Sequence, residues 1–164
     1  SDNGGGGSAD NAPLRGRKGQ MFEGGIRVPC IVKWPGKIPA GATSDEFLTS
    51  LEILPTLCAA TGAAPPKGVA LDGFDMLSVL QGKRASPRAE MFWQRKLDKA
   101  ARVGHWKWVE SSRGNGLFDL CHDIGERRDL SKERPEILRR VQARFANWKK
   151  QMQAAEPRGP FRDF

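Results

Sequence analysis

The strongest pattern of apolar and polar positions lies near the end of the chain, where apolar residues recur at intervals of three and four. This spacing places them on one side of a helix and basic residues on the other. The apolar positions are Ile137, Leu138, Val141, Phe145, Trp148 and Met152, and the basic ones are Arg139, Arg140, Arg144, Lys149 and Lys150. Pro135 suits the first helical turn, which needs no backbone N–H. We predict a long amphipathic helix whose apolar side packs against a sheet.

Four short runs ahead of this helix predict the strands of that sheet: residues 91–93, 101–103, 105–109 and 117–120. They are rich in aromatic, β-branched and other apolar side chains. Gly104 and residues 111–116 supply turn-forming positions between them. Short strands joined by tight turns pair with their neighbours in the chain, so we expect an antiparallel sheet.

The first part of the chain has a different pattern. Residues 1–25 are rich in glycine and predict a long, shaped loop, of the kind that usually carries function. Residues 26–34 (IRVPCIVKW) are largely apolar and β-branched, and they predict a buried strand ended by Pro35-Gly36. Pro29 within this run favours an edge position or an irregular start.

Residues 51–60 predict a helix in the middle of the chain. Thr49 or Ser50 can cap its start, and Gly62 can end it in the left-handed conformation. A second, shorter helical segment is expected over residues 75–80. The segment after Pro157 is expected to be a frayed tail.

Composition narrows the classes of protein that fit. With 38% hydrophobic and 28% charged residues, the chain can bury a core and does not resemble a disordered protein. No apolar run approaches the ~20 residues that span a bilayer, so no membrane partner is expected. The start at Ser1-Asp2-Asn3-Gly4-Gly5 follows no basic and apolar leader and reads like the middle of a longer protein.

The net charge of +8 favours anionic partners. No helix-turn-helix, zinc-finger or RNA-binding motif accompanies this charge, and much of it lies on the predicted C-terminal helix, so nucleic acid is not expected as a partner. Two interpretations of the positive charge remain open: it forms a solvated basic face, or it forms a site for a sulfated or phosphorylated substrate.

The cysteines give little chemistry by themselves. Cys30 and Cys58 lie in apolar runs and are expected to be buried small hydrophobic residues. Cys121-His122 could supply two zinc ligands, but no second ligand cluster accompanies the pair.

Two short segments near the N-terminus carry candidate chemistry. Asp2-Asn3 offers two hard oxygen donors of the kind that Ca²⁺ and Mg²⁺ prefer, although turns use the same residues. Lys18 and the arginines around it could hold a tetrahedral oxyanion. Glu23 and Arg27 lie four residues apart and could form an ion pair. A phosphate-binding loop is excluded because GxxxxGK[ST] does not occur.

These segments together resemble a known family. The start SDNGG, the stretch PLRGRKGQMFEGGIRVPCIVKWPGKIPAG, and the later LEILPTLCAATGA, LDGFDMLSVLQGK, ARVGHWKWV and LFDLCHDIGERRDL occur in family order through nearly the whole chain. They are similar to the formylglycine-dependent sulfatases, especially the arylsulfatase and N-acetylgalactosamine-6-sulfatase-like branch.

The resemblance implies an α/β fold in two parts. Residues 1–83 would be the last part of the alkaline-phosphatase-like sulfatase domain, and residues 84–164 a C-terminal subdomain made of a small antiparallel sheet with a long C-terminal helix. It implies that the parent protein hydrolyses sulfate esters of a sugar or an aryl alcohol, and that this parent is periplasmic, secreted or lysosomal. The expected partner is therefore a sulfated small molecule or carbohydrate.

The resemblance also implies roles for single residues. Asp2 and Asn3 match the late pair of calcium ligands, and the Ca²⁺ they help to hold binds sulfate oxygens. Lys18 matches the catalytic-site lysine that contacts the sulfate group. The segment Trp93-Gln94-Arg95-Lys96 is a candidate for substrate contact. His105 occupies a position expected to be a surface turn, and Ile124 and Asp129 replace the usual Pro and Asn at structural turns.

One part of the family pattern does not occur. The nucleophile arises from Cys or Ser in a CxPSR-type motif, whereas the three cysteines here begin CIVK, CAAT and CHDI. We therefore expect the isolated chain to be inactive and to bind calcium weakly or not at all. An N-terminal segment without its neighbouring strands is expected to be exposed, which would favour self-association.

Two alternatives stay open at this point. One is a fragment of a related phosphoric or phosphonate ester hydrolase with the same metal-centred architecture. The other is a non-catalytic polyanion-binding module, whose binding would weaken steeply with salt and would not depend on Lys18.

Overall fold

The computed structural model describes residues 1–65 and 67–155, so the predicted tail after Pro157 lies outside the described residues. The chain divides into two compact units. One unit joins residues 1–30 to the described residues from 90 onward, and the other comprises residues 31–89. The expected boundary at residue 83 concerns the longer protein and stays a prediction. Within this chain, the first thirty residues belong with the C-terminal sheet.

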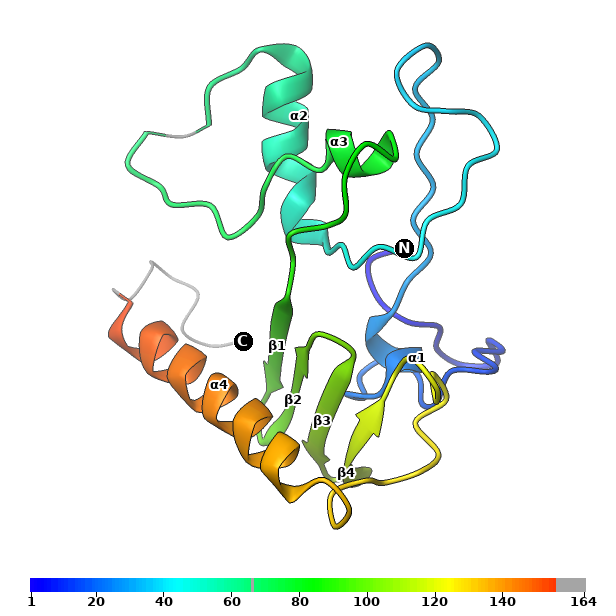
Figure 1. Ribbon diagram of the computed structural model, residues 1–164, viewed down its shortest axis with the longest axis vertical. Helices are drawn as coiled ribbons and strands as arrows, with labels where there is room; N and C mark the ends of the chain where they lie inside the picture. Colours follow the sequence, from blue (N-terminus) through cyan, green and yellow to red (C-terminus); the bar gives the residue numbers. More distant parts are fainter. Residues whose placement is uncertain (66, 156–164) are drawn as a thin grey trace. The chain divides into compact units, whose positions relative to one another are not determined.

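The first unit is built on a four-stranded antiparallel sheet (Figure 1). Its strands lie in chain order: β1 (Glu90–Arg95), β2 (Asp98–Val103), β3 (Trp106–Ser111) and β4 (Gly114–Asp119). Arg95 pairs with Asp98 and Val103 with Trp106, so two residues form each of these turns. Lys96 and Gly104 occupy them with φ of 55° and 61°, the left-handed conformation that such tight turns require. The predicted antiparallel sheet is confirmed.

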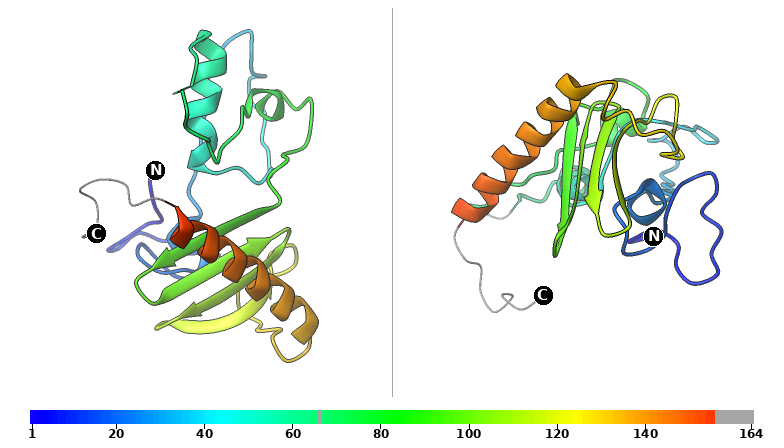
Figure 2. Two further views of the ribbon diagram at one scale, coloured as in Figure 1. Left: turned by 90° about the vertical axis from the view of Figure 1, so that its left-hand side faces the viewer. Right: turned by 90° about the horizontal axis from the view of Figure 1, so that it is seen from below.

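One face of the sheet is covered by α4 (Pro135–Ala154), the predicted long helix, with Pro135 in its first turn (Figure 2). Val141 and Phe145 are buried against Ala101, Trp108 and Leu117. The basic residues of the helix lie on the outer side. None of the described helices is long and apolar enough to cross a membrane.

The opposite face of the sheet is covered by the N-terminal segment, as Figure 2 shows from below. This segment is a loop with one short helix, α1 (Glu23–Ile26). Met21 and Phe22 are buried against Ala100, Val109 and Phe118. The N-terminal segment is therefore packed at residues 21–25, whereas most of residues 1–20 and 27–45 are exposed, as expected. Self-association stays a prediction.

The predicted strand over residues 26–34 does not form. Ile26 ends α1, and the residues after it have no regular structure. Ile31 is 93% exposed and Cys30 is also exposed, so the expectation that both are buried is wrong. A strand needs backbone partners. The four strands of the described residues pair only with one another and offer this segment none.

The described residues of the second unit form three short helices: a 3-10 turn, η1 (Ser50–Glu52), followed by α2 (Ile53–Thr61), and then α3 (Leu77–Leu80). Thr49 and Glu52 form a capping box at the start of η1, and Gly62 ends α2 at a φ of 72°, as predicted. Cys58 is half-buried rather than buried. Glu52 is fully buried and forms an ion pair with Arg88, which anchors this unit.

Candidate functional site

Backbone hydrogen bonds bring the two candidate segments of the N-terminus side by side. The N–H of Lys18 donates to the carbonyl of Gly5 at 2.9 Å. The N–H of Gly4 donates to the carbonyl of Gly25 at 3.1 Å, and that of Gly24 to the carbonyl of Arg15 at 2.7 Å. The loop therefore folds back twice, and Lys18 lies beside the residues that directly follow Asp2-Asn3.

The glycines in this loop are required by how closely its backbone segments approach one another. A Cβ added to Gly4 would lie 1.9 Å from the carbonyl oxygen of Gly24, and one added to Gly25 would lie 2.2 Å from that of Gln20. A Cβ on Gly24 would lie 2.4 Å from the carbonyl oxygen of Gly16. Glycine is the residue that permits such approaches. Close backbone packing thus explains the glycines at positions 4, 24 and 25.

Asp2 and Asn3 present oxygen donors at the surface. Asp2 is exposed and Asn3 is half-buried. The side-chain amide of Asn3 donates to Oδ2 of Asp2 at 2.7 Å, which orients the two groups together. Both kinds of oxygen suit a hard cation such as Ca²⁺, but that ion takes about six to eight ligands. In residues 1–65 and 67–155, no group of three or more His, Cys, Asp or Glu side chains is placed to hold a metal ion.

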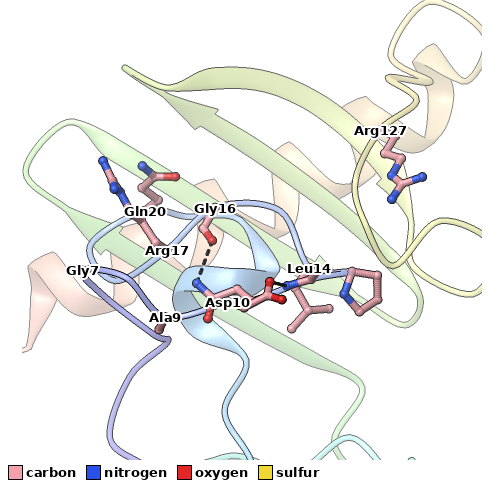
Figure 3. A pocket seen from close by; sticks show the side chains of 11 residues that line it. Gly7, Ala9, Asp10, Leu14, Gly16, Arg17, Gln20 and Arg127 are labelled. Carbon is pink, nitrogen blue, oxygen red and sulfur yellow. Dashed lines mark hydrogen bonds between the residues drawn. The ribbon is translucent and has the colours of Figure 1, made fainter.

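Lys18 is exposed, and its aliphatic carbons run alongside Gly6. No described carboxylate forms an ion pair with its ammonium group. Arg17 points elsewhere: it lines a shallow depression of about 520 Å³, shown in Figure 3, whose wall Lys18 does not join. Gln20 lies beside Arg17 in this view, and Arg127 lies at the opposite side.

A buried ionic cluster fixes the loop to the sheet. Nζ of Lys107, on β3, lies 2.8 Å from Oε1 of Glu23 and 2.9 Å from Oε1 of Glu126. The other carboxylate oxygen of Glu126 accepts the N–H of Glu23 at 2.5 Å. The predicted ion pair of Glu23 with Arg27 is confirmed, with Nε 2.8 Å from Oε2. Lys107 and Glu126 are fully buried, and Glu23 is nearly so.

The two glutamates of this cluster differ in acidity. Burial raises the pKa of both, since a buried carboxylate loses its water. At Glu23, the charges and hydrogen bonds of Lys107 and Arg27 outweigh burial, and its pKa is lowered. At Glu126, burial outweighs the attraction of Lys107, and its pKa is raised. Oε1 of Glu126 also accepts no hydrogen bond of good geometry from the described residues. The site therefore favours the ionised carboxylate at Glu23 more than at Glu126.

Sequence reasoning missed Lys107 and Glu126, although one signal pointed to Lys107. It alternates along β3 with Trp106 and Trp108, and it shares its face with Val109, which is fully buried. A lysine on a buried strand face needs acidic partners. Its acidic partners give no local pattern, because Glu23 lies 84 residues from Lys107 and 103 residues from Glu126 in the chain.

Arg15 has a structural contact rather than a free guanidinium. Its Nη1 donates to the carbonyl of Glu126 at 2.9 Å, and its guanidinium lies 3.9 Å from the centre of the Phe22 ring. Of the cations near the loop, Lys18 is thus better placed than Arg15 to bind an external anion.

In the predicted substrate segment, residues 93–96, Trp93 packs in the core, whereas Gln94 and Arg95 contact backbone carbonyls. Trp93 packs against the core formed by Met21 and Phe22. The side-chain amide of Gln94 donates to the carbonyl of Lys96 at 3.2 Å. Nη1 of Arg95 lies 3.5 Å from the carbonyl oxygen of Gly19, the residue after Lys18.

The remaining polar candidates lie in surface turns. His105 is exposed in the turn after β2, as expected. His122 is exposed and contacts Asp119, with Nδ1 2.9 Å from Oδ2. Asp129 accepts the N–H groups of Leu117 and Ser131 at 3.0 and 2.9 Å, so it has the structural turn role that was predicted.

Known proteins are similar to this chain over most of its length. Residues 17–151 match the family described as N-sulphoglucosamine sulphohydrolase, C-terminal. Human arylsulfatase A is 33% identical over 180 aligned residues, which cover 90% of this chain and 35% of that protein. The N-acetylgalactosamine-6-sulfatase of the dog is 33% identical over 106 residues, covering 62% of this chain and 20% of that protein.

Solved structures give the same result. The crystal structure of Ps i-CgsB in complex with k-i-k-neocarrahexaose superimposes with a TM-score of 0.79 at 30% identity, covering 89% of this chain and 34% of that one. This chain therefore spans about a third of the length of the relatives that it matches over most of its own length. The chain belongs to the sulfatase family, and its residues correspond to the C-terminal part of the family's proteins.

Proposed function

We propose that this chain contributes Lys18, Asp2 and Asn3 to the site of a sulfatase that hydrolyses sulfate esters of a carbohydrate or an aryl alcohol. One observation carries the proposal. The hydrogen bond from the Lys18 N–H to the Gly5 carbonyl, together with that from Gly4 to Gly25, holds the backbone of Lys18 next to the residues that directly follow Asp2 and Asn3. A sulfate group suits both kinds of residue, because its oxygens accept hydrogen bonds from a cationic donor and also bind a metal ion.

Lys18 would donate hydrogen bonds to a non-bridging sulfate oxygen. Negative charge on the transferring group changes during the reaction, and a fixed cation stabilises it without reorganising solvent. The buried cluster supports this role, since the ion pair of Glu23 with Lys107 fixes the loop that contains Lys18 to the sheet.

Asp2 and Asn3 would hold a calcium ion together with ligands from other parts of the protein. Their paired side chains fit a hard cation in chemistry, and they supply too few oxygens to complete its coordination. When bound, the ion would supply positive charge next to the sulfate oxygens.

The nucleophile would lie outside these 164 residues, since no CxPSR or SxPSR occurs among them. The substrate class follows from the relatives: one is named as an N-acetylgalactosamine-6-sulfatase, and one is solved in complex with a neocarrahexaose. A sulfated carbohydrate is therefore our first choice over an aryl sulfate.

The test uses a full-length sulfatase that contains this chain. Lys18→Ala should lower kcat/KM for a sulfate ester by about 2–4 kcal/mol of transition-state stabilisation, the usual loss for a charged donor to the reacting group. Arg17→Ala is the matched control and should cost much less, because Arg17 lines the separate depression. Equal losses for the two variants would show that the sulfate contact is assigned to the wrong residue. Faster turnover of a phosphonate monoester would favour the related phosphoric ester hydrolases instead.

A further inference from the structure

The turn between β1 and β2 presents two cations and one apolar side chain next to the Lys18 loop. Lys96 and Leu97 form the turn, between the paired residues Arg95 and Asp98. Lys96 has a φ of 55°, and the side chain of Leu97 is 86% exposed. A large apolar residue left this exposed at a hairpin tip contributes nothing to the core of the unit.

Strand alternation explains why Arg95 points toward the loop. Side chains two residues apart lie on one face of a strand. Trp93 packs on Met21 and Phe22, so Arg95 lies on that same face of the sheet. Its Nη1 is 3.5 Å from the carbonyl oxygen of Gly19, and a Cβ on Gly19 would lie only 3.9 Å from it. The guanidinium therefore lies over the turn that Lys18 enters.

Some cations of this unit have acidic partners, and those near Lys18 form no ion pair among the described residues. The paired ones are Arg27 and Lys107 with Glu23, Lys99 with Glu110, Arg128 with Glu133, and Arg144 with Glu90. Arg95, Lys96 and Lys18 form no ion pair with any residue of the described ranges. The acidic residue opposite Arg95, Asp98, accepts the N–H of Ser112 at 2.9 Å.

The contact with Gly19 also leaves most of the guanidinium available. Arginine carries five N–H donors in a planar fork that matches the oxygens of a sulfate or carboxylate. A single long contact to one carbonyl occupies one of them and orients the rest.

We infer that Arg95, with Lys96, binds a second anionic group of the substrate, a sulfate or carboxylate on the sugar next to the sulfate ester that Lys18 contacts. The inference rests on the proposed function, because it takes Lys18 as the contact for the first sulfate. It names the substrate class more closely: a carbohydrate with at least two anionic groups on the same or adjoining sugar units.

The test measures binding to a full-length sulfatase that contains this chain, with heteronuclear NMR titrations of three disaccharides that carry two sulfates, one sulfate and none. We expect the disulfated sugar to bind more tightly than the monosulfated one and to shift the amide signals of Gly19 and Lys96. Arg95→Ala should remove this advantage, a loss of about fivefold or more in affinity for the disulfated sugar. It should leave affinity for the monosulfated sugar nearly unchanged. Arg95→Lys should keep only part of the advantage, since it lacks the planar fork.

Two further variants separate this inference from the proposed function. Arg140→Ala removes an exposed charge from α4, on the other face of the sheet, and should change neither affinity. Lys18→Ala should weaken binding of the monosulfated sugar, and if it does not, the proposed function is contradicted. The inference itself is overturned if Arg95→Ala keeps the advantage, if Arg140→Ala loses as much of it, or if the disulfated sugar shifts no signal at Gly19, Arg95 or Lys96.

Discussion

Lys107 is a fully buried lysine, and its neighbours explain how the protein tolerates its charge. Two carboxylates lie within 3 Å of its ammonium group, at 2.8 and 2.9 Å. The pKa of Glu23 is lowered and that of Glu126 is raised, so the environment favours the ionised carboxylate at Glu23 more than at Glu126. A buried charge that loses its partner is costly, because desolvation is no longer compensated.

We therefore predict unequal costs for neutralising the two glutamates. Glu23→Gln should cost the more, up to about 3–5 kcal/mol of the free energy of unfolding, the usual cost of removing one partner from a buried ion pair. Glu126→Gln should cost much less, because its amide oxygen can still accept the N–H of Glu23. Denaturant unfolding of both variants at neutral pH is the measurement. A larger loss for Glu126→Gln would mean that the more ionised carboxylate is assigned wrongly.

The same pKa shifts predict how the two variants depend on pH. Because the pKa of Glu126 is raised in the folded state, its contribution to stability is present below the ordinary carboxyl pKa of 4.5 and is lost as pH rises through the raised value. Glu126→Gln should therefore gain on the wild type as pH increases above 4.5. Glu23 behaves oppositely, since its pKa is lowered: its contribution is present above 4.5 and is lost as pH falls through the lowered value. Profiles of the free energy of unfolding from about pH 3 to about pH 8, which bracket the ordinary carboxyl pKa, check the sign of the pH dependence for the wild type and both variants.

Elements with a local pattern could be predicted from the sequence, and the others could not. The spacing of Val141 and Phe145 identified α4, and Gly104 marked a turn, because both signals arise from neighbouring residues. The run at residues 26–34 has an equally apolar pattern and forms no strand, since a strand depends on a partner elsewhere. The buried ionic cluster was missed for the same reason, although the Glu23–Arg27 pair within it is local and was predicted correctly.

The close packing of the N-terminal loop makes its glycines sensitive to substitution. A Cβ on Gly24 would meet backbone oxygens at 2.4 and 2.7 Å, which no rotamer change can relieve. Gly24→Ala should therefore destabilise the fold by about 1–3 kcal/mol, the usual cost of overpacking. Gly6→Ala is the control within the same loop, because its nearest contact would be an ordinary 3.4 Å to the Lys18 side chain. Thermal unfolding should separate the two variants, and equal midpoints would contradict the packing described here.

Under the proposed function, the whole chain would carry part of a site rather than a complete one. It supplies two adjacent oxygen-bearing residues and one lysine, and it spans about a third of the length of human arylsulfatase A. The family resemblance predicted these residues, whereas the substrate pocket could not be predicted, because its walls come from separated loops.

We predict that the isolated chain neither hydrolyses a chromogenic aryl sulfate nor binds calcium tightly. The first follows from the missing CxPSR motif, and the second from a ligand set far below the usual six to eight oxygens. Turnover is compared with that of Lys18→Ala, and calcium binding is followed by calorimetric titration. Turnover above that variant, or one-to-one binding at micromolar calcium, would show that the site assembles without further ligands or a formylglycine.

The cluster around Lys107 also sets the order in which the chain can fold. The hydrogen bonds that Glu23 makes with Lys107 and Glu126 close loops of 84 and 103 residues. Contacts this distant in sequence form late, since the entropy of closing a long loop must be overcome before they stabilise anything. During synthesis, residues 1–30 emerge before β3 and the loop after β4, which form the surface of this unit on which they dock. The residues proposed to hold sulfate thus reach their final positions among the last of this unit.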